Sequence, residues 1–319
     1  MRIPRISLIS LILTASLTGQ SIPTDQVVYP SADILPALNI NLQGGYVNLV
    51  GGDGWRQAVR LGIADIAEFE WTRLGFYTDL TGKRQTIPTA GIKVRVPVTL
   101  RFLGISLALY NAQQWDYHPA ARYEDGMYNE YFDNYSRLAD AGHHLQQIDF
   151  ESIYSRLDVL TTIRLTEKLH LHPSAYYLES KSRNLDVIWV EEDSLDNPDY
   201  FRSTFTNEGQ QKNWLTGYAL GLTYELNDQL TYLAQWVVQP QYHFNYDAKS
   251  LELQHRNVWV AGVRYLLLSP IVLDVGLFND EFEGSLSDVQ IYAMLNAVID
   301  VRAILDRWRG LREATRQQE

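Results

Sequence analysis

The sequence predicts an all-β fold: a transmembrane antiparallel up-and-down β-barrel of about twelve strands (roughly ten to fourteen), followed by a C-terminal amphipathic helix. Apolar and polar residues alternate in segment after segment, and short connections alternate with long polar ones. Hydrophobic residues make up 46% of the chain, yet mean hydropathy is only −0.21. A barrel averages out in this way because outward and inward side chains alternate.

The stretch Tyr218–Trp236 shows the alternation most clearly. Every second residue from Tyr218 to Leu226 is Tyr or Leu, with small or polar residues between them. Asn227 and Asp228 are turn formers, and the alternation then restarts. This pattern predicts a β-hairpin with one apolar face.

Composition narrows the class of protein. The net charge of −11 argues against a nucleic-acid partner. The absence of cysteine excludes disulfides, thiolate metal sites and lipid attachment through an N-terminal Cys. Aromatic residues reach 12%, and Tyr and Trp rings suit the two interfaces of a membrane. The candidates for such an aromatic girdle are Trp71, Tyr218, Tyr224, Tyr232, Trp236, Trp259 and Tyr265.

The N-terminus predicts export. Residues 1–21 carry Arg2 and Arg5, then a short apolar run and small residues before position 22, which is the layout of a signal peptide. No run of about 18 apolar residues occurs after it, so no membrane helix is expected in the mature chain. Residues 22–37 have three prolines and mixed polarity, and they predict a periplasmic leader that contributes at most an early strand.

The first ninety residues alternate weakly. Leu38–Val50 is interrupted by glycines, and Val59–Trp71 predicts one strand with a bulge or face change near Asp65. Gly91–Leu100 alternates cleanly, with Pro97 expected near the strand end because it lacks a backbone donor. The chain shows about eleven clear strands, and since single-chain barrels favour even numbers we expect twelve, with one missed in this region.

Three later stretches predict loops. They are Asn111–Gln147, Lys181–Asn213 and Gln239–Ser250, which are polar and lack the apolar alternation of their neighbours. Short connections, such as Thr166–Lys168 and Asn227–Asp228, occur between them. Long loops at one end and tight turns at the other are typical of an outer-membrane barrel, and we expect the tight turns to be periplasmic.

The chain resembles a bacterial outer-membrane β-barrel of porin-like build, with residues 38–299 forming the barrel. The resemblance rests on the signal peptide, the series of hairpins, the aromatic outer face and the acidic loops. It implies location in the outer membrane, contact with its lipid and lipopolysaccharide, and assembly by the barrel-assembly machinery. The oligomeric state stays open, and no cofactor is predicted.

Residues 300–319 predict a helix. Val301, Trp308 and Leu311 recur at helical spacing together with Ile304 or Leu305, and arginines occupy the remaining faces. One interpretation is a periplasmic amphipathic helix that lies on the inner leaflet or plugs the barrel mouth. The other is a solvated helix packed on the barrel rim.

Charged residues of both signs occur at the inward positions of the predicted strands, so we expect ion pairs inside the lumen. The members of this predicted lumen network are Glu68, Glu70, Lys93, Arg95, Arg156, Asp158, Arg164, Glu225, Arg264 and Asp274. A narrow barrel filled by the network would be closed or only slightly conductive, whereas a wider, water-filled barrel would use the same charges to select ions.

Three functions fit this pattern. The first is a passive channel or small-solute transporter. The second is a non-conducting surface barrel whose acidic extracellular loops bind a partner. The third is a rim-located hydrolase, for which Asp116 and His118 are weak catalytic candidates because an Asp–His pair can activate water or serine. No nucleophile motif accompanies them, and the acidic spacing Asp193, Asp196, Asp199 does not match an EF-hand, so neither catalysis nor a metal site is favoured.

Overall fold

The computed structural model describes residues 30–49, 52–78, 84–119, 143–191, 201–207, 209–245, 248, 250–279 and 289–316. They form strands and a C-terminal helix. The elements are β1 (Asn39–Leu49), β2 (Gly52–Ile63), β3 (Ala67–Thr78), β4 (Arg84–Val96), β5 (Leu103–Pro119), β6 (His143–Arg164), β7 (Leu169–Glu191), β8 (Phe201–Asn207), β9 (Gln211–Asn227), β10 (Leu230–Asn245), β11 (Ser250–Leu268), β12 (Ile271–Asn279), β13 (Gln290–Asp300) and α3 (Val301–Arg316).

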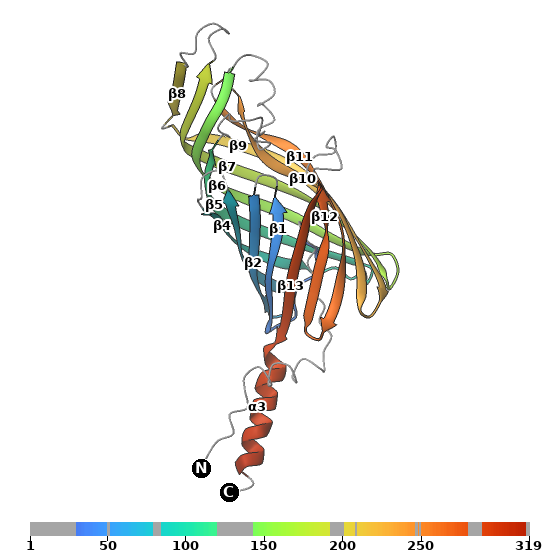
Figure 1. Cartoon of the computed structure of the whole chain (residues 1–319). Helices are drawn as coiled ribbons and strands as arrows, with labels where there is room; N and C mark the ends of the chain where they lie inside the picture. The colour runs from blue at the N-terminus through green and yellow to red at the C-terminus, as the bar shows by residue number, and fades with distance from the viewer. Residues whose placement is uncertain are drawn as a thin grey trace.

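Twelve of these strands close into an antiparallel barrel (Figure 1). Each strand pairs with its neighbour in the chain, except that β7 pairs with β9 along the wall. β1 pairs with β13 from Asn39 opposite Asp300 to Val47 opposite Tyr292, and this seam closes the barrel. β8 pairs with the far end of β7 and extends the wall outward there. The predicted fold class and the count of twelve are confirmed.

The strand missing from the sequence pattern lies in the first ninety residues, as expected. Val59–Trp71 is two strands rather than one bulged strand, because β2 ends at Ile63 and β3 begins at Ala67. Ala64 and Asp65 turn the chain with φ values of 53° and 59°. Tight hairpins need this left-handed conformation, for which Gly is the usual signal, so the irregularity that the sequence shows at Asp65 was interpreted as a bulge and not as a turn.

The two predicted short connections turn as their residue types suggest. The Thr166 hydroxyl accepts hydrogen bonds from the N–H groups of Lys168 (3.2 Å) and Leu169 (3.0 Å). The Asn227 side chain accepts from Gln229 and Leu230 N–H, both at 2.9 Å. Side-chain oxygens of this kind replace the backbone partners that a turn leaves unsatisfied. We call this end of the barrel the tight-turn end and the opposite end the loop end.

The predicted long loops are wrong in extent. β5 continues to Pro119 and β6 begins at His143, so both run into the stretch expected to be a loop. β7 likewise continues to Glu191, and β10 to Asn245. Strands that leave the apolar layer have water on both sides and need no alternation, so their pairing cannot be seen in the sequence.

The barrel wall separates two kinds of side chain. Along β9, burial alternates from Leu215 to Gly221, so that buried residues point inward and exposed residues point outward.

Within the described part of the chain no helix is long and apolar enough to cross a membrane.

The segment Pro30–Ala37, which we call the N-terminal strap, forms no strand and lies inside the barrel near the tight-turn end. Ser31 and Leu35 are both 0% exposed, and Ala32 is 2% exposed. The strap is the second half of the predicted leader (residues 22–37), whose earlier residues lie outside the described ranges, as does the predicted signal peptide. α3 leaves the same end and points away from the barrel (Figure 1), so the strap and not α3 occupies the lumen in this structure.

Candidate functional site: the barrel lumen

A buried charge cluster forms on β2, β3 and β4. The Glu68 carboxylate lies 3.3 Å from Lys93 Nζ and 4.0 Å from Arg60 Nη1. All three side chains are 3% exposed or less. Charges removed from water in this way are stable only when paired, so the cluster depends on all of its members.

The strap is held by hydrogen bonds to this wall. Leu35 N–H donates to Glu68 Oε2 (2.9 Å), and Ser106 Oγ donates to the carbonyl of Ala32 (2.6 Å). Lys93 Nζ donates to the carbonyl of Ser31 (3.4 Å). The segment therefore pairs its backbone with inward side chains instead of with a strand, as buried backbone groups require.

An ion pair fixes the strap nearer the tight-turn end. Arg164 Nη2 donates to Asp33 Oδ1 at 2.6 Å. Their side chains are 38% and 22% exposed, so water reaches this pair.

Farther toward the loop end, Arg156 lies among aromatic rings. Its Nε is 3.0 Å from Asp158 Oδ1, and its guanidinium lies 4.9 Å from the Tyr110 ring centre and 5.8 Å from that of Tyr176. Tyr176 donates to the carbonyl of Val238 on β10 at 2.7 Å. The rings and Asp158 fix the guanidinium plane, and its side chain stays 23% exposed.

A second network crosses the seam between the first and last strands. Arg264 makes two hydrogen bonds to Asp274, at 2.8 and 2.9 Å. Asn296 Nδ2 donates to the same carboxylate (3.0 Å), and Gln43 Nε2 donates to Asn296 Oδ1 (3.0 Å). The network thus joins β11, β12, β13 and β1.

Three inward tyrosines lie against glycines on the neighbouring strand. The cross-strand pairs are Tyr110 with Gly91, Tyr176 with Gly217, and Tyr292 with Gly276. A Cβ added to any of these glycines would overlap the tyrosine side chain. Glycine therefore lets each ring lie close to the wall.

Gly217→Ala should lower the free energy of unfolding by about 1–3 kcal/mol, because the Tyr176 ring must leave its place over the strand. Urea unfolding in lipid vesicles measures the loss. Gly44→Ala is the control, since nothing lies within 4 Å of a Cβ built there. The double variant Gly217→Ala/Tyr176→Ala should show a non-additive loss, and equal effects at Gly217 and Gly44 would contradict the packing argument.

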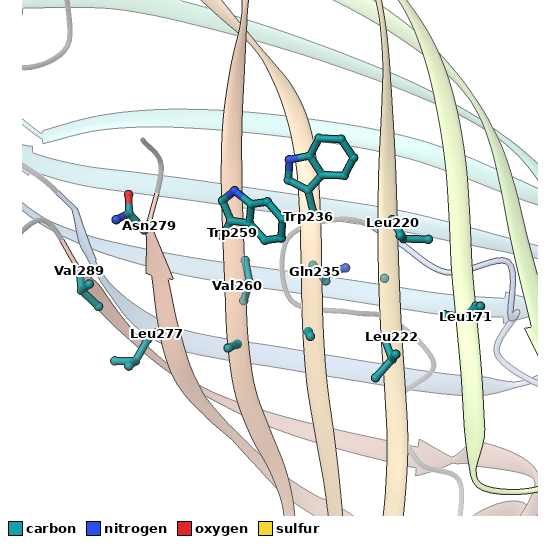
Figure 2. Close-up of a pocket in the computed structure, with 13 residues that line it drawn as sticks. Leu171, Leu220, Leu222, Gln235, Trp236, Trp259, Val260, Leu277, Asn279 and Val289 are labelled. Atoms are coloured by element: carbon teal, nitrogen blue, oxygen red, sulfur yellow. The ribbon is translucent and has the colours of Figure 1, made fainter. Parts of the chain in front are cut away.

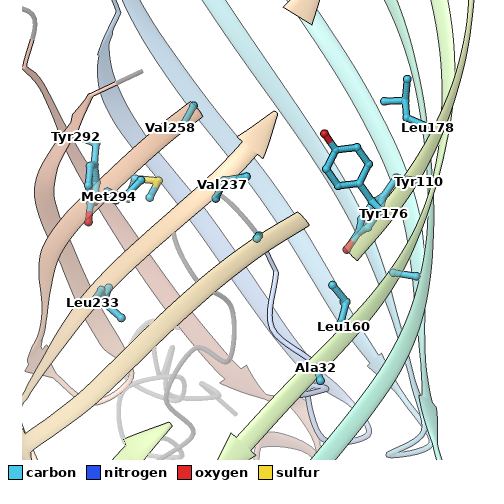
Figure 3. Packing of buried hydrophobic residues seen from close by; sticks show 13 residues of the cluster. Ala32, Tyr110, Leu160, Tyr176, Leu178, Leu233, Val237, Val258, Tyr292 and Met294 are labelled. Atoms are coloured by element: carbon cyan, nitrogen blue, oxygen red, sulfur yellow. The ribbon is translucent and has the colours of Figure 1, made fainter. Parts of the chain in front are cut away.

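Part of the inner wall is apolar (Figure 3). Leu160, Leu233, Val237, Val258 and Met294 are 4% exposed or less. The sequence pattern predicted a polar lumen and missed this cluster, although Leu160 and Leu233 stand at inward positions. A barrel with an apolar inner patch is partly filled by its own side chains.

The ten charged residues predicted for the lumen fall into three groups. Glu68, Lys93, Asp158, Arg264 and Asp274 are buried. Glu70, Arg156, Arg164 and Glu225 are half-buried, and Arg95 is exposed at the end of its strand. The structure brings Glu68 to Lys93, Arg156 to Asp158, and Arg264 to Asp274. Sequence reasoning missed Arg60, Asn296, Gln43 and the strap.

The outer face carries an apolar band. Leu109, Leu157, Leu220 and Leu295 are each between 45% and 50% exposed, at outward positions of four strands. Exposing so much apolar surface to water is unfavourable, whereas contact with lipid chains is not. Within lipid, strands satisfy their backbone hydrogen bonds only when the sheet closes into a barrel. The chain is a closed β-barrel with the lipid-facing outer surface of a transmembrane barrel.

The predicted girdle residues lie on this outer face. Tyr218 packs edge-on against Trp236 with ring centres 5.2 Å apart, and Trp236 stacks on Trp259 at 5.6 Å. Below the two tryptophans lies a shallow apolar depression of about 450 Å³ (Figure 2), where small side chains leave room in the barrel wall. Trp71, Tyr224, Tyr232 and Tyr265 are 38–44% exposed.

Searches against known proteins give structural matches only. No family model and no curated protein matches the chain. The NanC porin is similar at 9% identity, with 82% of this chain and 98% of that chain covered and a TM-score of 0.43. The translocator domain of the autotransporter NalP from Neisseria meningitidis gives 11% identity, 82% and 86% coverage and a TM-score of 0.41. Outer membrane phospholipase A from Escherichia coli is similar at 11% identity, with 83% of this chain and 93% of that chain covered and a TM-score of 0.34.

The weak catalytic candidates stand on β5. Asp116 and His118 pair with Phe150 and Ile148 of β6, and their side chains lie outside the described part of the molecule. Asp193, Asp196 and Asp199 lie outside the described ranges altogether. Among the residues that the structure describes, no group of three His, Asp or Glu side chains could hold a metal ion.

Proposed function

We propose that the protein is a small-solute channel of the outer membrane with one narrow, charged constriction. The observation that carries the proposal is how the exposed fraction of the charged side chains changes along the inner wall. Arg156 is 23% exposed toward the loop end, and Arg164 is 38% exposed at the tight-turn end. Between them Glu68 is 1% exposed. Charged side chains that keep some exposed surface on either side of a buried charge cluster are an arrangement that a gated or selective pore can use.

The constriction is composed of the charge cluster at Glu68 and the N-terminal strap. The strap reaches the wall through single hydrogen bonds and one hydrated ion pair, each of which is weak by itself. Such a segment can shift without unfolding a strand. A solute passing the constriction would meet charges of both signs, so the constriction would not strongly favour the passage of either anionic or cationic solutes.

The test is single-channel conductance of folded, heat-modifiable protein in planar bilayers. Discrete openings are expected from the natural sequence. Asp33→Ala/Ser106→Ala removes two strap contacts and should give larger or longer openings. Asp228→Ala is the control, because it changes an exposed acidic residue at the same end of the barrel.

Silence from the folded natural protein and from the strap variant would overturn the channel. It would favour the second candidate, a non-conducting surface barrel. The observation in its favour is the same buried layer, since Glu68, Lys93 and Asp158 leave almost no exposed surface. That barrel would act through its loop end, and loop substitutions would abolish binding of its partner while leaving folding intact.

A further inference from the structure

α3 is anchored to the end of the barrel wall. Ala303 N–H donates to Asp300 Oδ1 (3.1 Å), which caps the first turn of the helix. Val301 N–H donates to the carbonyl of Leu38 (3.0 Å), the residue before β1. Because β1 and β13 are wall strands, these bonds place the first turn of α3 next to the lipid headgroups at the tight-turn end.

The helix has one apolar face. At about 100° per residue, Val301, Ile304, Leu305 and Trp308 share one side. The described strands leave Leu305 44% exposed and Trp308 48% exposed. Figure 1 shows α3 extending away from the barrel, which agrees with the partial exposure of Leu305 and Trp308.

The charge of α3 opposes the charge of the chain. Its 16 residues contain five arginines and two acidic residues, a net of +3, whereas the whole chain carries −11. Arg302 and Arg309 border the apolar face, and both are exposed. Arginine beside an apolar stripe with Trp is the pattern of helices that lie in a membrane interface, where long stems reach up to the headgroups.

We propose that α3 docks on anionic lipid headgroups of the leaflet at the tight-turn end, with Leu305 and Trp308 inserted below them. Rotation of the helix about its anchored first turn brings the apolar face onto the leaflet. Apolar burial and arginine–headgroup attraction then both favour the docked position, at about fivefold in the docked-to-free ratio for each arginine near an anionic surface. This proposal is independent of whether the barrel conducts.

Because the sequence contains no cysteine, a label attached to a single introduced Cys reports on that position alone. Full-length Leu305→Cys, labelled with an environment-sensitive fluorophore, is folded into phosphatidylcholine vesicles with or without about one quarter phosphatidylglycerol. Ala314→Cys is the matched control, since it lies nine residues on and therefore on the opposite side of the helix. A blue shift and loss of quenching by aqueous iodide are expected at 305 in anionic vesicles, and little change is expected at 314.

The double variant Arg302→Gln/Arg309→Gln in the Leu305→Cys background should reduce the docked-to-free ratio about 25-fold at low salt. Three outcomes would overturn the proposal. One is equal exposure of 305 and 314 in both lipids. Another is protection of the label at position 305 from iodide that is the same in neutral and anionic vesicles, as a helix in the barrel mouth would give. The third is protection that rises with the protein-to-lipid ratio, which would identify a second copy as the occupant.

Discussion

Asp274→Ala is expected to destabilise the barrel by about 3–5 kcal/mol, because the substitution leaves the Arg264 guanidinium buried without its carboxylate. Asp274 is 0% exposed and Arg264 is 6% exposed. The same carboxylate accepts from Asn296, whose amide oxygen in turn accepts from Gln43. The change therefore also removes the hydrogen bond from Asn296 on β13, the residue through which the network reaches Gln43 on β1 at the seam where the barrel closes.

Urea titration in vesicles, read by heat-modifiable gel mobility, measures the effect as a lower midpoint. Asp306→Ala is the control, because the Arg309–Asp306 pair on α3 is 3.7 Å long and both side chains are more than 60% exposed. Such a pair contributes about 0–1 kcal/mol. The double variant Arg264→Leu/Asp274→Leu should recover much of the loss, since it removes both charges. A midpoint of Asp274→Ala within error of Asp306→Ala would show that the seam network carries no stability.

The seam illustrates what the sequence could predict. Alternation placed Arg264 and Asp274 at inward positions of consecutive strands, and the register pairs them directly. Their partners Asn296 and Gln43 were missed because neutral amides give no charge signal. Gln43 also comes from the other end of the chain, and only barrel closure brings it to β13.

The lipid layer explains why the strand count was predictable and the strand lengths were not. Inside the apolar layer every second residue must be apolar, so the wall strands left eleven recognisable patterns, and the preference for even strand numbers supplied the twelfth. Outside the layer β7 runs on to Glu191 with no such constraint. The Ala64–Asp65 turn and the strap share this limit, because backbone conformation and single hydrogen bonds to distant side chains leave no period in the sequence.

The tyrosine–glycine pairs mark another boundary of sequence reasoning. Gly217 and Tyr176 both lie at inward positions, yet 41 residues separate them. A glycine inside a strand usually signals a bulge or a close approach, without saying by what. The register between β7 and β9 supplies the missing information, since it sets the two residues directly opposite each other.

The second prediction with a large expected effect concerns the lipid-facing apolar band. Leu220→Arg should lower the free energy of unfolding by about 2–4 kcal/mol, because it places a cation near the bilayer midplane. Leu220 is 45% exposed on the outer face of β9 and lies midway between Trp214 and Leu226. Trp214 and Tyr224 lie ten residues apart, which at about 3.3 Å per residue and a tilt of about 40° is roughly 25 Å, the height of an apolar band.

Leu226→Arg is the matched control, since it makes the same change on the same face of the same strand at the tight-turn rim, where the cost is about 0–1 kcal/mol. Reversible urea unfolding in vesicles compares the two variants directly. Equal losses at 220 and 226 would mean that lipid depth does not distinguish the positions, and the band would have to be placed elsewhere along the wall. A large loss at 220 alone would fix the membrane midplane at Leu220 and, through β9, set the depth of the Glu68 constriction relative to both leaflets.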